Sequence, residues 1–187
     1  MKTIKLIIFL SIFAWCTGFF YFLSYTKSIN NTNRNITQAI IIYGGNKERL
    51  YVGTKLLKLG YAPVVHITGY KPESEYNDFI KINNLAPEQF IFNKTLSSNN
   101  LTPLEDTLSF MKKFQFHTAR VVINATQIPR ARIDFKTKVP NEIELIPHVV
   151  SIKEEKDFKV FIEYLKFSIT LIASFVGMEN EFNLSYP

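Results

Sequence analysis

The stretch of sequence that decides the fold is residues 39–50, AIIIYGGNKERL. Its first five residues are apolar and dominated by isoleucine, which is typical of a strand buried on both faces of a parallel sheet. Gly44 and Gly45 then permit a sharp turn without Cβ atoms, and a helix that begins near Asn46 would point its free N–H groups at the same place. The pattern favours an anion-binding turn, with a tight turn that holds no ligand as the alternative.

The composition indicates a single globular domain. The chain has 187 residues and a net charge of +6, and hydrophobic residues make up 47% of it. About 150 residues remain once an apolar N-terminal segment is set aside, which is enough for one sizeable core. The Lys and Arg residues form no basic stripe, so we expect no nucleic-acid partner. Cys16 is the only cysteine, which excludes a disulfide framework and a thiolate metal cluster.

The N-terminal segment, residues 1–27, is expected to be a transmembrane anchor. It contains the uncharged run LIIFLSIFAWCTGFFYFLSYT, close to the roughly 20 residues that a helix needs to cross the hydrocarbon core. A cleaved signal peptide and a buried helix are the alternatives. Lys2, Lys5 and the amino terminus precede the run, and Lys27 and Arg34 follow it. This bias favours an N-terminus inside the cell and a domain outside it.

The rest of the chain alternates predicted strands with predicted helices. A polar tether, residues 28–38, leads into a domain over residues 39–150. The pattern predicts strands at 39–43, 63–68, 89–92, 120–124 and 143–146, with helices at 47–59, 73–85, 103–116 and 129–138 between them. This alternation implies an α/β fold, a Rossmann-like three-layer sandwich with a mainly parallel sheet.

Three residues are expected to mark the ends of these elements. Gly60 follows the first helix of the domain, as a C-terminal cap would. Thr102 precedes the third helix and is followed three residues later by a glutamate, which fits a capping box. Pro147 is expected to end the last strand.

Residues 151–187 are expected to hold a C-terminal helix and a tail. The helix, at residues 157–177, is amphipathic in its first half and apolar all round in its second half. Packing on the sheet is one interpretation. The other is a helix that lies against the membrane or binds a membrane-protein partner.

Small and polar residues collect where the predicted strands end. In open parallel sheets, ligands bind beyond the carboxyl ends of the strands. Here those ends carry Gly44-Gly45, Thr68-Gly69, the polar run at 97–100 and the segment 124–130. We therefore expect these four loops to form one binding crevice.

The order of these segments resembles the YdcF/SanA/ElyC-like family of bacterial envelope-associated proteins, a domain of unknown function. IYGGNKERL, LLKLGYAPVVHITG, a polar run before a helix, and VVINATQIPRA follow one another as the family's signatures do, from about residue 39 to residue 150. The resemblance implies a Rossmann-like domain with a role in cell-envelope or peptidoglycan-precursor metabolism. Together with the span, it implies a single-pass protein of the bacterial inner (cytoplasmic) membrane, with its domain on the periplasmic or outer side.

The resemblance also carries binding positions onto this sequence. The first motif supplies a Gly-rich turn followed by an arginine, the second a hydroxyl-Gly pair, and the last a Pro-Arg-Ala end. The neutral residues around them would donate or accept hydrogen bonds. The candidate ligand-binding residues are Gly44, Gly45, Arg49, Thr68, Gly69, Asn100, Thr102, Asn124, Gln127 and Arg130.

The chain departs from the family pattern at two places. Thr126-Gln127 stands where the family has Tyr-His, and Gln127 cannot titrate near neutral pH as an imidazole does. The family's Asn-Thr…Asn segment is not clearly matched, so that either Asn100 or Thr102 stands at the position of its threonine. Whether the chain is an enzyme is therefore left open.

The expected ligand is an anion. Arg49 and Arg130 would bind a phosphate or a carboxylate, in the bidentate way that guanidinium groups favour. His66 and His117 are expected to be packed or surface residues, whereas His148 could reach the crevice. No His, Asp and Glu residues have metal-ligand spacing, so no metal site is predicted. The pattern identifies no cofactor.

Three functions follow from this pattern. The first is a membrane-anchored domain that binds an anionic, phosphate-bearing small molecule in envelope or peptidoglycan-precursor metabolism. The second is a transferase or hydrolase that acts on a lipid-linked phosphate. The third is a non-catalytic scaffold with a degenerate pocket.

Overall fold

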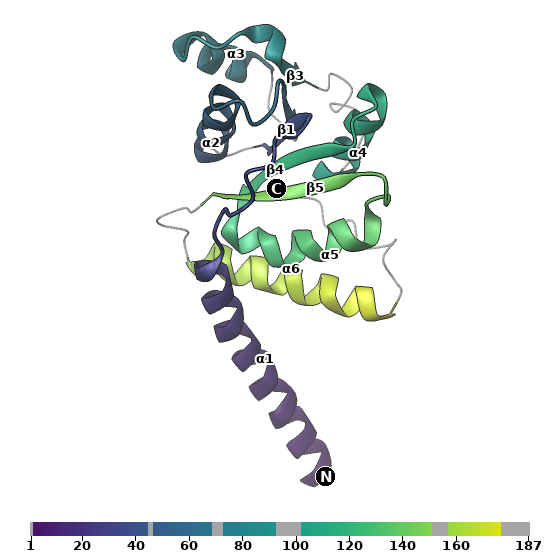
Figure 1. Ribbon diagram of the computed structural model, residues 1–187. Helices are drawn as coiled ribbons and strands as arrows, with labels where there is room; N and C mark the ends of the chain where they lie inside the picture. Colours follow the sequence, from purple (N-terminus) through teal and green to yellow (C-terminus); the bar gives the residue numbers. More distant parts are fainter. Residues whose placement is uncertain (1, 45–46, 69–72, 93–101, 151–156, 177–187) are drawn as a thin grey trace.

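The computed structural model describes residues 2–44, 47–68, 73–92, 102–150 and 157–176. Its centre is a five-stranded, all-parallel sheet in the order β3-β2-β1-β4-β5 (Figure 1). The strands are β1 (Ala39–Tyr43), β2 (Val65–Thr68), β3 (Phe90–Phe92), β4 (Thr118–Asn124) and β5 (Glu144–Val150). The predicted Rossmann-like α/β fold is therefore confirmed.

Helices cover both faces of the sheet (Figure 1). On one face lie α2 (Lys47–Lys58) and α3 (Glu73–Ile82), and on the other lie α4 (Pro103–Phe114) and α5 (Ile128–Lys138). Outside α5 runs α6 (Asp157–Val176), and α1 (Lys2–Ser28) leaves the domain on the same side. Two short 3-10 helices, η1 (Pro87–Gln89) and η3 (Ala125–Gln127), precede β3 and α5.

The strand β1 forms the middle of the core, as its apolar sequence predicts. Ile40 and Ile42 pack on the side of α2 and α3, whereas Ala39 and Ile41 pack on the side of α4 and α5. All four are at most 1% exposed. A strand with two buried faces cannot alternate apolar and polar residues, which explains the continuous isoleucine run.

Two predicted helix ends are confirmed. Gly60 has a positive φ of 75°, which glycine adopts without strain, and its N–H donates to Leu57 O at the end of α2. At the start of α4, Thr102 Oγ1 accepts from Glu105 N, and Thr102 N donates to the Glu105 carboxylate at 2.7 Å. This is the complete capping box.

The prediction that Pro147 ends the last strand is wrong. β5 continues through Pro147 to Val150 and pairs with β4 along its whole length. β5 is an edge strand, where a residue without an N–H can face away from the ladder. The outer edge is covered further along, because Asn31 accepts from Val149 N at 2.6 Å and donates to Val149 O at 2.9 Å.

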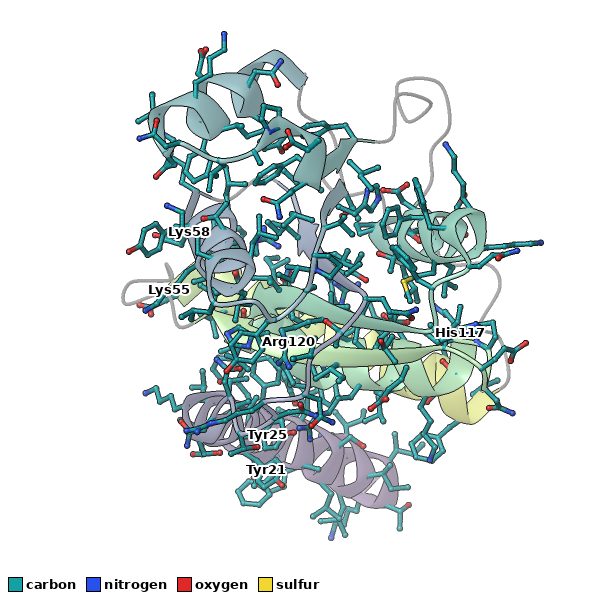
Figure 2. The ribbon with its side chains drawn as sticks, turned by 45° about the horizontal axis from the view of Figure 1, so that its top comes forward. Tyr21, Tyr25, Lys55, Lys58, His117 and Arg120 are labelled. Carbon is teal, nitrogen blue, oxygen red and sulfur yellow. The ribbon has the colours of Figure 1, made fainter. Side chains whose placement is uncertain are left out.

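The polar segment that leads into β1 is docked on the sheet. Arg120, in β4, donates to Asn33 O at 3.1 Å and to Asn35 O at 2.6 Å. Its side chain lies in the interior, whereas Lys55 and Lys58 lie at the surface of α2 (Figure 2). Burial lowers the pKa of Arg120, although the nearby Tyr61 opposes the shift. The segment between α1 and β1, residues 29–38, is therefore bound over the sheet, and we call it the strap.

Within the described residues, α1 is the one helix long and apolar enough to cross a membrane. Its first half is exposed along its length. Its second half packs against the domain, where Phe22 and Thr26 are buried and the hydroxyl of Tyr25 accepts from Arg132 of α5.

Candidate functional site

The strand order places a topological switch point between β1 and β4. The chain runs outward from β1 through β2 to β3 and then returns to the other side of β1 for β4 and β5. Where strand order reverses in this way, the loops at the carboxyl ends of the two central strands diverge, and open α/β sheets bind ligands there. The residues that follow β1 and β4 at this point include Gly44 and Gln127.

Gly44 is the first of the predicted residues at this rim. Its N–H donates to Thr68 O at 2.7 Å, which joins the ends of β1 and β2. A Cβ at this position would lie 2.2 Å from Thr68 O, so the turn needs a residue without a side chain. Thr68 itself is fully buried, and its hydroxyl donates to Ile42 O at 3.4 Å. Thr68 supports the turn from behind the rim.

Arg49 connects the ends of β1 and β4 at the switch point. From the first turn of α2, its Nη2 donates to Gly44 O at 3.0 Å, and its Nη1 donates to Gln127 Oε1 at 3.4 Å. Gln127 is the last residue of η3 and directly precedes α5. Three of the predicted binding residues therefore meet around one guanidinium, although Arg49 and Gln127 are 78 positions apart in the sequence.

Arg130 lies on the first turn of α5 and faces α6. Its Nη2 is 3.9 Å from Glu163 Oε2, and Lys166 Nζ is 3.4 Å from the other oxygen of the same carboxylate. The side chains of Arg130 and Glu163 are 19% and 13% exposed, so the group is largely shielded from water. Sequence reasoning missed Glu163, since nothing near it in the sequence indicates an arginine partner.

Asn124 and Thr126 are two more polar residues, in the segment that leads from β4 to α5. Asn124 ends β4 and is 8% exposed, and its side chain does not cap η3. Thr126 is 7% exposed, and its Oγ1 has no hydrogen-bond partner in the part of the chain that the structure describes. A buried hydroxyl without a partner costs free energy, so Thr126 is a position where a ligand oxygen would be stabilising.

The remaining predicted residues divide into two groups. Thr102 uses its hydroxyl and its N–H in the capping box of α4. Gly45, Gly69 and Asn100 lie outside the described residues, as does the polar run that was expected to form the third loop of the crevice.

His66 and Asp106 form a buried polar pair that sequence reasoning did not find. His66 Nε2 lies 3.1 Å from Asp106 Oδ2, and both side chains are 1% exposed. His66 Nδ1 lies 2.9 Å from Ile91 O, which can only accept, so Nδ1 carries the hydrogen of that contact. The ring stacks on Phe110. The pair joins β2 to α4, and the prediction of a packed His66 is confirmed.

His148 lies on the same face of the sheet as Val122 and Arg120. Burial, with the positive charge of Arg120 as a smaller cause, lowers the pKa of His148 to about 4. The imidazole is therefore neutral at neutral pH. Its Nδ1 is buried and finds no hydrogen-bond partner among the described residues.

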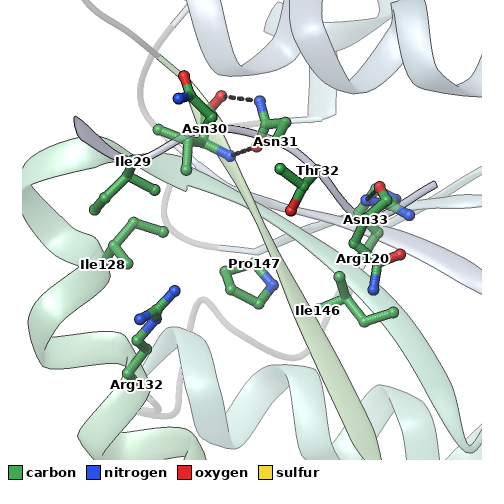
Figure 3. A pocket seen from close by; sticks show the side chains of 11 residues that line it. Ile29, Asn30, Asn31, Thr32, Asn33, Arg120, Ile128, Arg132, Ile146 and Pro147 are labelled. Atoms are coloured by element: carbon green, nitrogen blue, oxygen red, sulfur yellow. Dashed lines mark hydrogen bonds between the residues drawn. The ribbon is translucent and has the colours of Figure 1, made fainter. Parts of the chain in front are cut away.

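A separate cavity of about 190 Å³ lies where the strap crosses β5. Residues 29–33 line it on one side, with Arg120, Ile128 and Arg132 on the domain side (Figure 3). None of the ten predicted binding residues lines it. The guanidinium of Arg120 is held by the strap carbonyls, so we assign this cavity to the packing between strap and sheet.

The described residues contain no group of three or more His, Cys, Asp or Glu side chains that could hold a metal ion. The chemistry available at the rim is that of guanidinium, amide and hydroxyl groups. These groups bind and orient oxyanions.

Fold and rim together define a class: an α/β domain with a five-stranded parallel sheet, preceded by an apolar helix that could cross a membrane. The chain is similar to the uncharacterized protein RC1356 of Rickettsia conorii, with 29% identity over 153 residues, which cover 79% of this chain and 88% of the relative. It is 28% identical to the uncharacterized protein RP875 of Rickettsia prowazekii over 157 residues, covering 81% of this chain and 88% of that protein. No protein-family model and no solved structure matches the chain.

Proposed function

We propose that this protein is a membrane-anchored domain that binds an anionic, phosphate-bearing small molecule at the crevice between β1 and β4. The observation that carries the proposal is the position of Arg49. Its guanidinium reaches across the switch point and is oriented by Gly44 O and by Gln127 Oε1. An oriented guanidinium offers N–H donors in a planar fork that matches the oxygens of a phosphate.

The surroundings of Arg49 support an anionic ligand. Arg130 adds a second cation three residues after Gln127, and Thr126 adds a buried hydroxyl. The crevice also lies at the N-terminal ends of α2 and α5, where helix dipoles favour negative charge. Glu163 offsets part of the charge of Arg130, so Arg49 is the stronger of the two candidates for the ligand.

The proposed setting is the bacterial cell envelope. The apolar helix α1 supports a membrane anchor, and the lysines before it favour a domain on the periplasmic or outer side of the inner membrane. A role in envelope or peptidoglycan-precursor metabolism is supported by the resemblance of the strand-end motifs to the YdcF/SanA/ElyC-like family. A lipid-linked phosphate is a ligand that would be found at the membrane and would carry the anionic group that the arginines favour.

Calorimetry on the full chain in detergent micelles tests the binding. Inorganic phosphate, pyrophosphate and a short-chain polyprenyl phosphate are titrated into the protein and into Arg49→Gln and Arg130→Gln. Loss of a charged hydrogen-bonding partner costs roughly 1.5–3 kcal/mol, so we expect roughly ten- to a hundredfold weaker binding for Arg49→Gln and a smaller loss for Arg130→Gln. Lys55→Gln, at the exposed far end of α2, is the matched control and should bind as the unmodified protein does.

Two outcomes would overturn this function. One is that none of the three phosphates binds to the unmodified chain. The other is that each phosphate ligand that binds to the unmodified chain binds with equal affinity to Arg49→Gln and to Lys55→Gln. Either result favours a scaffold whose crevice has lost its ligand.

A further inference from the structure

The helix α6 crosses α1 inside the apolar part of α1. Aromatic rings of the two helices interlock at this crossing: Tyr164 lies 5.2 Å from Trp15, 5.1 Å from Phe19 and 5.4 Å from Phe22, measured between ring centroids. The hydroxyl of Tyr164 also donates to Trp15 O at 2.7 Å. A Cβ on Gly18 would lie 2.7 Å from this hydroxyl, so the close approach depends on glycine.

The position of the crossing along α1 determines how deep α6 lies relative to a membrane that α1 crosses. The contacts centre on Phe19, which precedes the end of the apolar run at Thr26 by roughly 10 Å of helix, at 1.5 Å per residue. The part of α1 before Trp15 is about 20 Å long, too short to cross a hydrocarbon core of roughly 30 Å. If α1 spans the membrane, its second half must also lie in the bilayer, and α6 is carried to the membrane surface with it.

The outer face of α6 is apolar. Phe158, Ile169, Ile172 and Val176 are 73%, 38%, 63% and 61% exposed. Their spacing of 11, 3 and 4 residues places them within an arc of about 60° on the helix. We call these four residues the α6 stripe. An exposed apolar stripe of this length is typical of an interaction surface.

Of the charged residues of α6, Glu163 and Lys166 lie on the side of the domain, whereas Asp157 and Lys159 at its start are exposed. Glu163 lies 3.9 Å from Arg130 of α5 and 3.4 Å from Lys166 of its own helix. The stripe lies on the opposite side of the helix from Glu163, and the segment 167–176 carries no charged residue. In Figure 1, α6 is the layer of the domain on the side toward which α1 projects.

We propose that α6 lies in the boundary between lipid headgroups and acyl chains of the membrane that α1 crosses, with the α6 stripe facing the lipid. Helices with one apolar face typically sink about 5–10 Å into this boundary, close to the depth that the crossing with α1 requires. The inference rests on the anchor of the proposed function. It adds that the docked strap and α6 hold the domain against the bilayer, with Arg130 one helix away from the lipid.

Spin-label accessibility on the full chain in phosphatidylcholine–phosphatidylglycerol vesicles tests this placement. Cys16 is replaced by serine, and single cysteines are introduced as Ile172→Cys in the stripe, Ile8→Cys in α1 and Ile82→Cys in α3. All three isoleucines are exposed, at 63%, 54% and 81%, so a nitroxide fits at each. Val176→Cys provides a second label in the stripe, and circular dichroism checks that each variant is folded.

We expect the label at position 172 to collide several-fold more with oxygen, relative to a water-soluble nickel chelate, than the label at position 82. Its ratio should approach that at position 8. Access of nickel at 172 equal to that at 82 would overturn the inference, while a lipid-exposed label at 8 would still leave the anchor in place. If the label at position 172 is shielded from both oxygen and the nickel chelate, the inference is also overturned, and the α6 stripe would instead be covered by a second copy of the chain. Nickel access at 8 would refute the anchor itself.

Discussion

The polar groups inside the domain and those at its rim are held differently. Inside, Arg120 meets two carbonyls at 2.6 and 3.1 Å, and His66 meets Asp106 at 3.1 Å. At the rim, Arg49 donates to Gly44 O at 3.0 Å, but the contacts between side chains, of Arg49 with Gln127 and of Arg130 with Glu163, are 3.4 and 3.9 Å long. Short, buried contacts stabilise the fold, whereas long contacts at an edge can be exchanged for contacts with a ligand. The two regions should therefore respond to mutation in opposite ways.

The largest effect is expected inside the domain, at Asp106. Asp106→Ala leaves a buried imidazole without its carboxylate and should lower the free energy of unfolding by about 3–5 kcal/mol. Urea unfolding of the full chain in detergent, followed by circular dichroism, measures the change. Asp134→Ala is the matched control, because Asp134 is paired with Lys138 on the surface of a helix, where such a pair contributes less than about 1 kcal/mol. Equal losses for the two variants would contradict the comparison.

The second effect is a dependence on pH through His148. Its pKa in the folded protein is about 4, below the ordinary 6.5, so the unfolded chain binds more protons between these values. The stability is fully present above pH 6.5 and is lost as the pH falls toward 4, by about 1 kcal/mol at pH 5 once screening by solvent is allowed for. His148→Gln should flatten the stability curve in this window. His117→Gln removes an exposed histidine and should leave the slope unchanged.

Thr102 lies at the rim by position but is held as an interior residue is. Thr102→Ala removes the side-chain half of the capping box of α4 and should cost about 1 kcal/mol of stability. Ser109→Ala, at an exposed position of the same helix, should change it far less. If Thr102→Ala instead weakens phosphate binding and leaves the unfolding midpoint unchanged, the hydroxyl binds the ligand. Thr102 would then belong with the rim residues and not with the interior ones.

The smallest change in stability is expected at Arg49, the centre of the rim. Arg49→Gln removes two hydrogen bonds at a partly exposed site, so the free energy of unfolding should fall by about 1 kcal/mol or less. The same variant should show the largest loss of phosphate affinity. Thermal unfolding with and without pyrophosphate tests both statements, since bound ligand should raise the melting temperature of the unmodified chain more than that of Arg49→Gln. A loss of stability as large as that of Asp106→Ala would place Arg49 with the interior groups.

Several parts of the site could be predicted from sequence, and others could not. Gly44, Arg49 and Gln127 were expected at strand ends, and they do meet at the switch point. The partner of Arg130 was missed, because Glu163 belongs to a helix whose packing no local pattern specifies. The contact of Asp106 with His66 could not be predicted for the same reason, since it joins a strand and a helix whose residues are 40 positions apart.

The sequence alone determined the features that depend on near neighbours. The isoleucine run of β1 requires two covered faces, Gly60 permits a positive φ, and Thr102 caps α4, because each acts through the backbone within a few residues. The tertiary structure alone decided the strand order, the strap bound by Arg120 and the crossing of α1 with α6. These contacts join segments far apart in the chain, and hydrophobic periodicity shows which face of an element is buried but not which partner buries it.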